Sequence, residues 1–230
     1  CSVRRQRQMC IRDSYYDKKW YSEDWYLNDK GFSLNYTHKD RIKFACSVFK
    51  KKSDPGLKLS YHSSDTYILA VALNNFYKSK MGKDSDVYTD LVLPLWKELN
   101  LSQSTHEIRR SIDNIRQPYM EYGMFLTSDD LVKIGNFLLK DNDLTQSAIM
   151  SDALQKNKNN RGLTAINNIL FYNNGFWSKR FSGPSLGCNE DIWIPFMSGF
   201  GGITVVLLPN SSIYYYSVSY THLRAHETGY

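Results

Sequence analysis

Long apolar runs, cofactor-binding loops and repeated segments are all missing from this sequence of 230 residues. No apolar run approaches the roughly 20 residues that a membrane-spanning helix requires, so we expect no membrane span. Neither a Gly-rich phosphate-binding loop nor a cluster of metal ligands with suitable spacing occurs, so we expect no cofactor and no metal. Without an internal repeat or a low-complexity linker, the chain is long enough to form one domain or two lobes.

The two ends of the chain can be encoded by the two strands of one short DNA. Residues 9–13 (Met-Cys-Ile-Arg-Asp) can be back-translated as ATG TGT ATA AGA GAC. The reverse complement of that DNA encodes residues 218–222 (Val-Ser-Tyr-Thr-His). The pattern resembles translated read-through of a transposon-type sequencing adapter. We therefore exclude residues 1–14 and 218–230 from the prediction of the fold, and expect the natural gene to have been cut at both ends.

Excluding the two ends removes several apparent signals. The ends carry a net charge of +3 out of the formal +6, and the remaining charge does not indicate a nucleic-acid partner. His222 and His226 would lie on one helical face, as zinc ligands do, but both belong to an excluded end. Cys46 and Cys188 remain; they permit a disulfide without implying one, and we expect two partly buried thiols.

The apolar periodicity changes along the chain from that of helices to that of strands. Apolar residues at three- and four-residue spacing, together with helix-end signals, predict helices over residues 39–50, 63–80 and 86–99, and a fourth that starts at residue 128. Ser63 or Ser64 is expected to cap the second helix, and Pro94 to break the third. A capping box at residues 127–130 precedes the fourth. β-branched and aromatic residues predict strands over residues 168–177, 192–197, 203–208 and 213–218, with a turn at 209–212. We therefore predict an α+β fold, with a mainly helical lobe over residues 15–160 and antiparallel strands over residues 161–217.

The segment over residues 55–66 carries the clearest chemical signal. A Pro-Gly turn leads into a short apolar piece, then Tyr61, then a Ser/Asp/Thr cluster that opens the helix. A tyrosine can transfer protons near neutral pH only when a neighbouring cation favours its phenolate form. Taken alone, the same pattern is compatible with a half-buried tyrosine beside a helix-capping serine.

Tyr61-His62-Ser63 resembles the Tyr-x-Asn/Ser motif of the serine β-lactamase and penicillin-binding superfamily, in particular its class C-like branch of esterases and amide hydrolases. The similarity covers nearly all of residues 40–217, through the segments 67–70 (Tyr-Ile-Leu-Ala), 93–96 (Leu-Pro-Leu-Trp), 122–123 (Tyr-Gly) and 127–131 (Thr-Ser-Asp-Asp-Leu). In that family the tyrosine carries protons to and from a nucleophilic serine. The resemblance implies that Tyr61 is catalytic and that Ser63 positions a lysine and the substrate amide.

A second part of the resemblance lies near the end of the chain. The stretch Ser198-Gly199-Phe200-Gly201 is similar to the family's Lys-Thr-Gly or His-x-Gly motif, with Ser198 and Gly199 at its last two positions. The resemblance implies that Phe200 donates a backbone N–H to the oxyanion hole and that the glycines allow close approach of the substrate. Met197 departs from the motif because it offers no cation, which favours an ester or neutral amide over a β-lactam. A Gly-rich strand turn remains the alternative.

The family's Ser-x-x-Lys nucleophile is expected to be missing. Ser47 and Lys50 have the required spacing, but only 14 positions separate Ser47 from Tyr61, where the family inserts most of a helical lobe. The lysines that follow Lys50 indicate a solvated helix end. Ser185 lies in a Gly-x-Ser-x-Gly sequence, yet no apolar strand precedes it and no helix follows, as an α/β-hydrolase nucleophile elbow requires.

The resemblance therefore implies a C-terminal fragment of a β-lactamase-related serine hydrolase, incomplete at both ends. Its parent would hydrolyse a small ester, amide, β-lactam or peptide-like substrate through an acyl-enzyme, and would be periplasmic or secreted. Without the nucleophile, we expect this chain to be inactive. The competing hypothesis is a non-catalytic binding or sensor protein built on the penicillin-recognition fold. We also expect poor solubility, because apolar strands would lose their cover.

Overall fold

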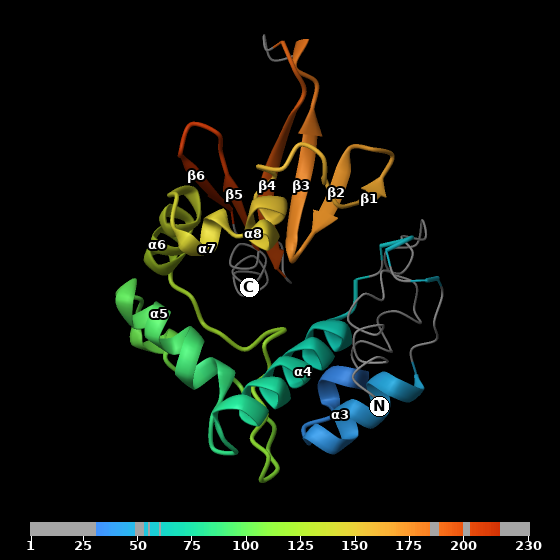
Figure 1. Cartoon of the computed structure of the whole chain (residues 1–230), viewed down its shortest axis with the longest axis vertical. Coiled ribbons are helices and arrows are strands. Elements are labelled where there is room, and N and C mark those ends of the chain that lie inside the picture. The colour runs from blue at the N-terminus through green and yellow to red at the C-terminus, as the bar shows by residue number, and fades with distance from the viewer. Residues whose placement is uncertain are drawn as a thin grey trace, which may run out of the picture. The chain divides into compact units, whose positions relative to one another are not determined.

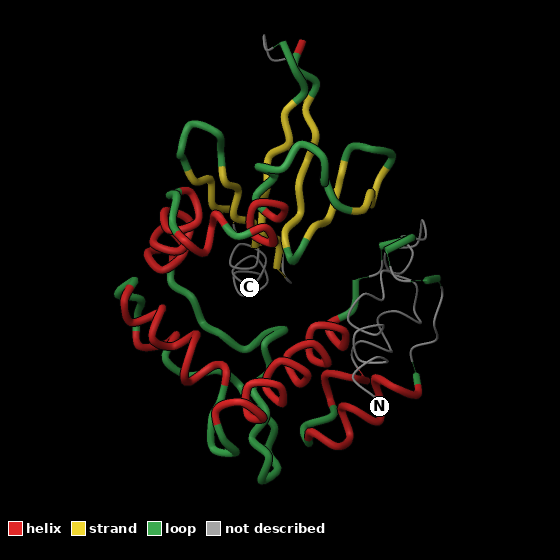
Figure 2. The backbone as a smooth tube through the Cα atoms, viewed as in Figure 1, coloured by secondary structure: helices red, strands yellow, loops and turns green. Residues whose placement is uncertain are grey.

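The computed structural model describes residues 31–48, 53–54, 56–59, 61–184, 189–199 and 203–216. The chain divides into two compact units, Cys1–Leu126 and Thr127–Tyr230. Helices and loops form the described part of the first unit, and a sheet with three short helices forms that of the second (Figures 1 and 2). The strands begin at Leu163, close to the predicted change at residue 160, but the unit boundary lies earlier because the helices before them pack on the sheet.

The first unit contains the helices α3 (His38–Ser47) and α4 (Ser63–Met81), which pack against each other. They are followed by the π-helical turn η1 (Tyr88–Val92), α5 (Leu93–Glu98) and the 3₁₀ turn η2 (Gln103–Thr105). Pro94 lies in the first turn of α5, where its missing N–H costs no helical hydrogen bond. The predicted break at Pro94 is thus a change from a π turn to an α-helix, located at the start of α5.

Aromatic side chains dominate the core of this unit. Phe32, Tyr67 and Tyr119 are completely or almost completely buried and lie beside Ile68 and Val71 of α4. The Tyr67 ring packs edge-on against Phe32 and Tyr119, with centroid distances of 5.7 and 5.8 Å. Such edge-to-face pairs add about 0.5–1.5 kcal/mol beyond the burial of their area.

A charged side chain lies inside this aromatic core. The Arg41 side chain of α3 is fully buried, and it forms a buried ion pair with Glu121. Its guanidinium carbon lies 4.2 Å from the ring centre of Phe32, 4.6 Å from that of Tyr67 and 4.0 Å from that of Tyr119. We call these three rings the aromatic cage. Cation–π attraction and the ion pair offset part of the cost of removing the guanidinium from water.

Buried amides attach the long loop after η2 to α4. The Asn74 side chain donates to the Gln117 side-chain oxygen over 3.3 Å and accepts from the Val87 N–H at 3.0 Å. The Gln117 N–H in turn donates to the Ser111 hydroxyl at 2.9 Å. Because these groups are buried, each hydrogen bond removes an otherwise costly unsatisfied polar atom. The loop is therefore held in one place on the helix.

The second unit contains α6 (Ser128–Leu139), α7 (Asp143–Gln146), α8 (Ala148–Ala153) and a six-stranded sheet. The strands are β1 (Leu163–Ile166), β2 (Leu170–Asn173), β3 (Phe176–Phe181), β4 (Ile192–Gly199), β5 (Ile203–Leu207) and β6 (Ile213–Tyr216). They are antiparallel to their neighbours and follow the chain order across the sheet. Helices plus an antiparallel sheet confirm the predicted α+β class.

Helix α6 begins at the predicted capping box and packs on the end of the sheet. The Thr127 hydroxyl accepts from the Asp130 N–H, and the Asp130 carboxylate accepts from the Thr127 N–H. α6 contacts β5 and β6, and α8 contacts β2. Leu138, Leu154 and Leu207 form the buried centre of this contact. The start of this helix at the predicted capping box is thereby confirmed.

The predicted strand over residues 168–177 is wrong in one respect: it is two strands joined by a tight turn. Asn174 and Gly175 separate β2 from β3, with φ angles of 47° and 92°. Both positive φ values match the Asn-Gly dipeptide, which is the strongest short hairpin signal in a sequence. Strand β1 was not predicted, because its four residues are too few to show a clear alternation. The hairpin between β5 and β6 is confirmed.

Candidate active site

Tyr61 and Ser63 lie at the entry to α4. Helix α4 starts at Ser63, and its N-cap residue is His62, whose extended backbone (φ −139°, ψ 133°) makes no side-chain capping bond. The predicted serine cap is therefore wrong by one or two positions. Tyr61 is 49% exposed, so about half of the residue is accessible to solvent. Ser63 is half-buried in the first helical turn.

The position of α4 is fixed by contacts one turn beyond Ser63. The Tyr67 hydroxyl lies 2.9 Å from Nδ1 of His38 in α3, and the backbone N–H of His38 donates to the Asp113 carboxylate at 2.6 Å. Burial lowers the pKa of His38, with Asp113 opposing that shift and Lys78 adding to it. Burial also raises the pKa of Tyr67 well above its usual value. Tyr67 is therefore a neutral structural phenol and is no candidate for proton transfer near pH 7.

The second predicted half of the site lies at the end of β4. Ser198 pairs with Thr204 and Gly199 with Ile203, and both Ser198 and Gly199 are exposed. A Cβ atom built on Gly199 would approach only Ile203, at 3.9 Å. Internal packing of the described residues therefore does not require glycine at this position. The other two predicted residues, Phe200 and Gly201, lie outside the described residues.

Met197 belongs to the apolar core of the second unit. Its side chain packs against the cluster formed by Leu138, Leu154 and Leu207, together with Phe176 and other partly buried residues. Met197 pairs with Val205 of β5, which is 3% exposed. The residue at the motif position that carries a cation in the family is here an apolar packing residue.

Two other sequences could supply a nucleophile: Ser47 with Lys50, and the Gly-x-Ser-x-Gly sequence around Ser185. Of these three residues, the structure describes only Ser47. Ser47 is exposed at the last residue of α3, where its hydroxyl lies 3.5 Å from the Phe44 carbonyl oxygen. Lys50 and Ser185 lie outside the described residues. The Gly-x-Ser-x-Gly sequence lies between β3 and β4, which pair antiparallel. A nucleophile elbow requires a strand followed by a helix, so this interpretation of Ser185 does not apply.

The two predicted halves fall in different compact units, with Tyr61 and Ser63 in the first and Ser198 and Gly199 in the second. The surroundings of each pair of residues are therefore given within its own unit. Within the described ranges, no group of three or more metal-ligating side chains occurs. No helix in the described part of the chain is long and apolar enough to cross a membrane. Cys46 is exposed, unlike the partly buried thiol expected, and Cys188 lies outside the described residues.

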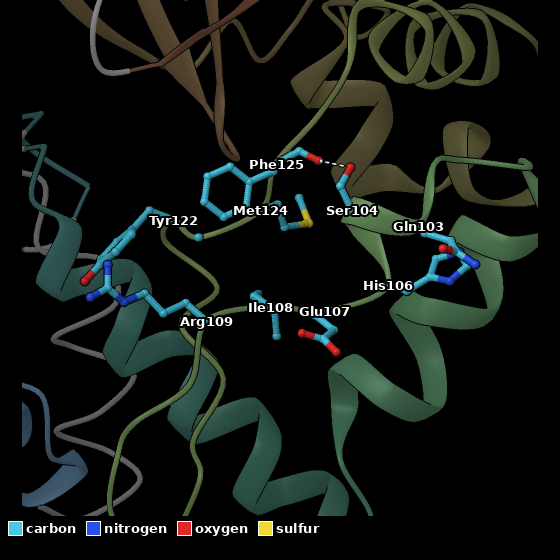
Figure 3. A pocket seen from close by; sticks show the side chains of 10 residues that line it. Gln103, Ser104, His106, Glu107, Ile108, Arg109, Tyr122, Met124 and Phe125 are labelled. Carbon is cyan, nitrogen blue, oxygen red and sulfur yellow. Dashed lines mark hydrogen bonds between the residues drawn. The ribbon is translucent and has the colours of Figure 1, made fainter.

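Sequence reasoning did not locate a pocket of about 830 Å³ in the first unit. Residues of two segments, 103–109 and 122–125, line it (Figure 3). The walls carry one cation, Arg109, one carboxylate, Glu107, and the apolar side chains of Ile108, Met124 and Phe125. The two segments are more than ten residues apart in the chain and have no shared periodicity. Only the Tyr122-Gly123 pair in the family resemblance marks the region in the sequence.

Comparisons with known proteins support the fold. No family model matches the chain, and no curated protein sequence matches it. A matching solved structure is described as a "Putative 6-aminohexanoate-dimer hydrolase from Bacillus anthracis". The identity is 16%, the TM-score is 0.53, and the match covers 96% of this chain but 58% of that one. The chain thus spans less than two thirds of the hydrolase. At this identity the likeness shows the fold alone, and it confirms an α+β, β-lactamase-like fold.

Proposed function

We propose that this chain is part of a β-lactamase-related serine hydrolase that cleaves a small ester or neutral amide through an acyl-enzyme. The observation that carries the proposal is an accessible phenol, Tyr61, at the start of a helix whose position is fixed by a buried core. The β-lactamase-like fold supports it. Tyr67 and Tyr119, by contrast, are buried in the core and are not accessible to a substrate.

In the proposed mechanism, an attacking serine forms an ester with the substrate acyl group, and water then releases the acid. Tyr61 takes the proton from the serine hydroxyl and returns it to the leaving group, which requires a neighbouring lysine to favour the phenolate. Ser63 hydrogen-bonds that lysine and the substrate amide. The backbone after Gly199, with Phe200 as N–H donor and Gly201 beside it, stabilises the oxyanion.

The serine and lysine of this mechanism have no counterpart among the described residues, so the chain is proposed to be inactive by itself. Ser47 supports this assignment, because it lies at an exposed helix end and its hydroxyl is directed at its own helix. Apolar packing of Met197 supports a substrate without a carboxylate at that position. The proposed fragment is incomplete at both ends.

The test has two stages. The chain as it stands is treated with a fluorophosphonate probe and with p-nitrophenyl acetate, and neither covalent labelling nor an acyl-enzyme burst is expected. The upstream gene is then recovered and the extended protein is assayed with the same reagents. We expect a Ser-x-x-Lys sequence roughly a hundred residues before Tyr61, and a 10²–10⁴-fold loss of kcat in Tyr61→Phe, typical of a lost proton-transfer group.

Tyr77→Phe is the matched control, because Tyr77 lies on α4, the helix that Tyr61 precedes, and is also partly exposed. It should leave kcat unchanged. Full activity in Tyr61→Phe of the extended protein would exclude the proposed role of the phenol. Labelling of Ser47 in the chain as it stands would show that the nucleophile is present.

A second candidate function is a non-catalytic binding or sensor protein with the same fold. The packing of the partly buried Met197 against apolar side chains favours it, because the motif position offers no cation to a substrate. An upstream sequence without Ser-x-x-Lys, combined with saturable ligand binding and no turnover, would support the sensor over the enzyme.

A further inference from the structure

The pocket of the first unit has walls that are held in place by hydrogen bonds. The Ser104 hydroxyl donates to the Phe125 carbonyl oxygen at 2.8 Å, and this bond joins the two lining segments (Figure 3). The Tyr119 N–H donates to the Arg109 carbonyl oxygen at 2.8 Å, which attaches the end of the first segment to the chain just before the second. A volume of about 830 Å³ falls within the range of small-molecule sites.

Arg109 supplies an accessible cation to this pocket. Its guanidinium carbon lies 5.7 Å from the ring centre of Tyr122 and 6.0 Å from that of Tyr36. The Tyr122 hydroxyl is itself held, because it accepts from the buried Arg41 guanidinium at 3.2 Å. Among the described residues, no carboxylate forms an ion pair with Arg109. The guanidinium is thus positioned by aromatic faces while its N–H donors stay available.

A glycine makes this arrangement possible. Gly123 has a φ of 103°, and a Cβ atom there would lie 2.5 Å from Cβ of Arg109. Any other residue would therefore push the 122–125 segment away from Arg109 and also suffer backbone strain. The close approach of the two segments, and with it the contact of Arg109 with Tyr122, depends on glycine at position 123.

The remaining wall is apolar. Phe125 is 76% exposed, whereas phenylalanine side chains are usually buried. Ile108 and Met124 lie between the end formed by Arg109 and Tyr122 and the end formed by His106 (Figure 3). These side chains offer contact area to an apolar ligand body next to the guanidinium.

We propose that this pocket binds a small monocarboxylate with an aromatic or aliphatic body. The carboxylate accepts from the Arg109 guanidinium, and the body packs on Met124 and Phe125. The Glu107 carboxylate points to a different side from the Arg109 guanidinium (Figure 3) and disfavours a second negative charge on the ligand. The proposal does not depend on hydrolysis, because it concerns binding by residues outside the catalytic set Tyr61 and Ser63.

The test uses three probes that share one body and differ in charge: 4-phenylbutyrate, 4-phenylbutanamide and 4-phenylbutylamine. Binding to the full chain is measured by isothermal titration calorimetry at low ionic strength. We expect 4-phenylbutyrate to bind saturably and about tenfold more tightly than the amide, and the amine to bind weakest. Since no turnover is measured, the result is independent of any nucleophile.

Arg109→Gln should reduce 4-phenylbutyrate affinity to that of the amide, and Arg109→Lys should retain part of the preference. Arg116→Gln is the matched control, because Arg116 is exposed in the same unit and does not line the pocket. Phe125→Ala should weaken all three probes. A thermal melt of each variant establishes that it is folded. Equal binding of acid and amide, an unchanged affinity in Arg109→Gln, or no saturable binding by the folded chain would overturn the proposal.

Discussion

The guanidinium of Arg41 lies 4.0 Å from the centre of the Tyr119 ring, in the interior of the first unit. Arg41 comes from α3, and Tyr119 comes from the loop that follows η2. The same side chain pairs with Glu121, 80 positions along the chain. One buried cation therefore connects three parts of the unit: α3, α4 through Tyr67, and the loop that carries one wall of the pocket.

Removing this cation should be among the most destabilising single changes in the first unit. Arg41→Met leaves the Glu121 carboxylate buried without its guanidinium partner, and we expect a loss of about 3–5 kcal/mol in the free energy of unfolding. The double variant Arg41→Met, Glu121→Met should lose less than the single variant, because both charges are then absent. Urea unfolding followed by circular dichroism measures both values. Arg116→Met, on the surface, should change stability by about 0.5 kcal/mol or less. A cost of that same small size for Arg41→Met would contradict a structural role of the ion pair.

His38 should make the stability of the chain depend on pH in the mildly acidic range. Burial is the main cause that lowers its pKa below 6.5. Between the lowered folded-state pKa and 6.5, the unfolded chain binds the proton more strongly than the folded chain, so the free energy of unfolding falls as pH drops through that window. Urea unfolding at pH 7.5 and pH 5.0 measures this difference. His38→Gln should reduce the difference, whereas Tyr67→Phe should keep it while lowering stability at both values. An identical pH difference in wild type and His38→Gln would show that His38 is not its source.

Gly135 of α6 should be coupled to Ile213 of β6. A Cβ atom at position 135 would lie 2.6 Å from Cδ1 of Ile213. Gly135→Ala gains about 1 kcal/mol in helix propensity, but the overlap should outweigh this and destabilise the second unit by about 1–3 kcal/mol. Ile213→Val removes the overlapping Cδ1 atom, so the same glycine change should cost less in that background. A double-mutant cycle of unfolding free energies measures the coupling. Additive effects would mean that α6 and β6 do not pack this closely.

The last described strand should promote association between molecules. Tyr214 and Tyr216 of β6 are 55% and 50% exposed and point to one face of the sheet, since their positions alternate with that of Tyr215. Exposed aromatic strands at the end of a sheet favour intermolecular contacts. Tyr214→Thr with Tyr216→Thr keeps residues suited to a strand and should lower light scattering at high protein concentration. Phe125→Thr, which removes an exposed ring from the first unit, should have a smaller effect. No difference between the two variants would place the association elsewhere.

The elements that could be predicted are those whose signals lie within a few neighbouring residues. The capping box at Thr127 and Asp130 predicts the start of α6, and it forms as expected because both partners are three positions apart. The apolar periodicity of α4 likewise predicts its extent to within one residue at the end. The Asn174-Gly175 turn carries an equally local signal, because both residues of this dipeptide adopt the positive φ angles that the hairpin needs.

The function is predicted from two short motifs, and the structure describes Tyr61, Ser63, Ser198 and Gly199 of them. Tyr61 is accessible, as a proton-transfer residue must be, and Ser63 follows it at the first residue of α4. The assignment of catalytic roles to Tyr61, Ser63, Ser198 and Gly199 stays a prediction. Met197 shows why a motif alone is insufficient: its side chain was judged by its missing charge, and the structure adds that it packs in the core.

The sequence by itself determined the α+β class, the positions of the main helices and the hairpin between β5 and β6, because hydrophobic periodicity and turn residues act locally. Only the tertiary structure decided that Arg41 is buried, that Met197 faces a core and that Arg109 lies beside Tyr122 in a pocket. These facts depend on partners far away in the chain. Burial of a charge is favourable only where such distant groups converge, and no pattern of neighbouring residues encodes that convergence.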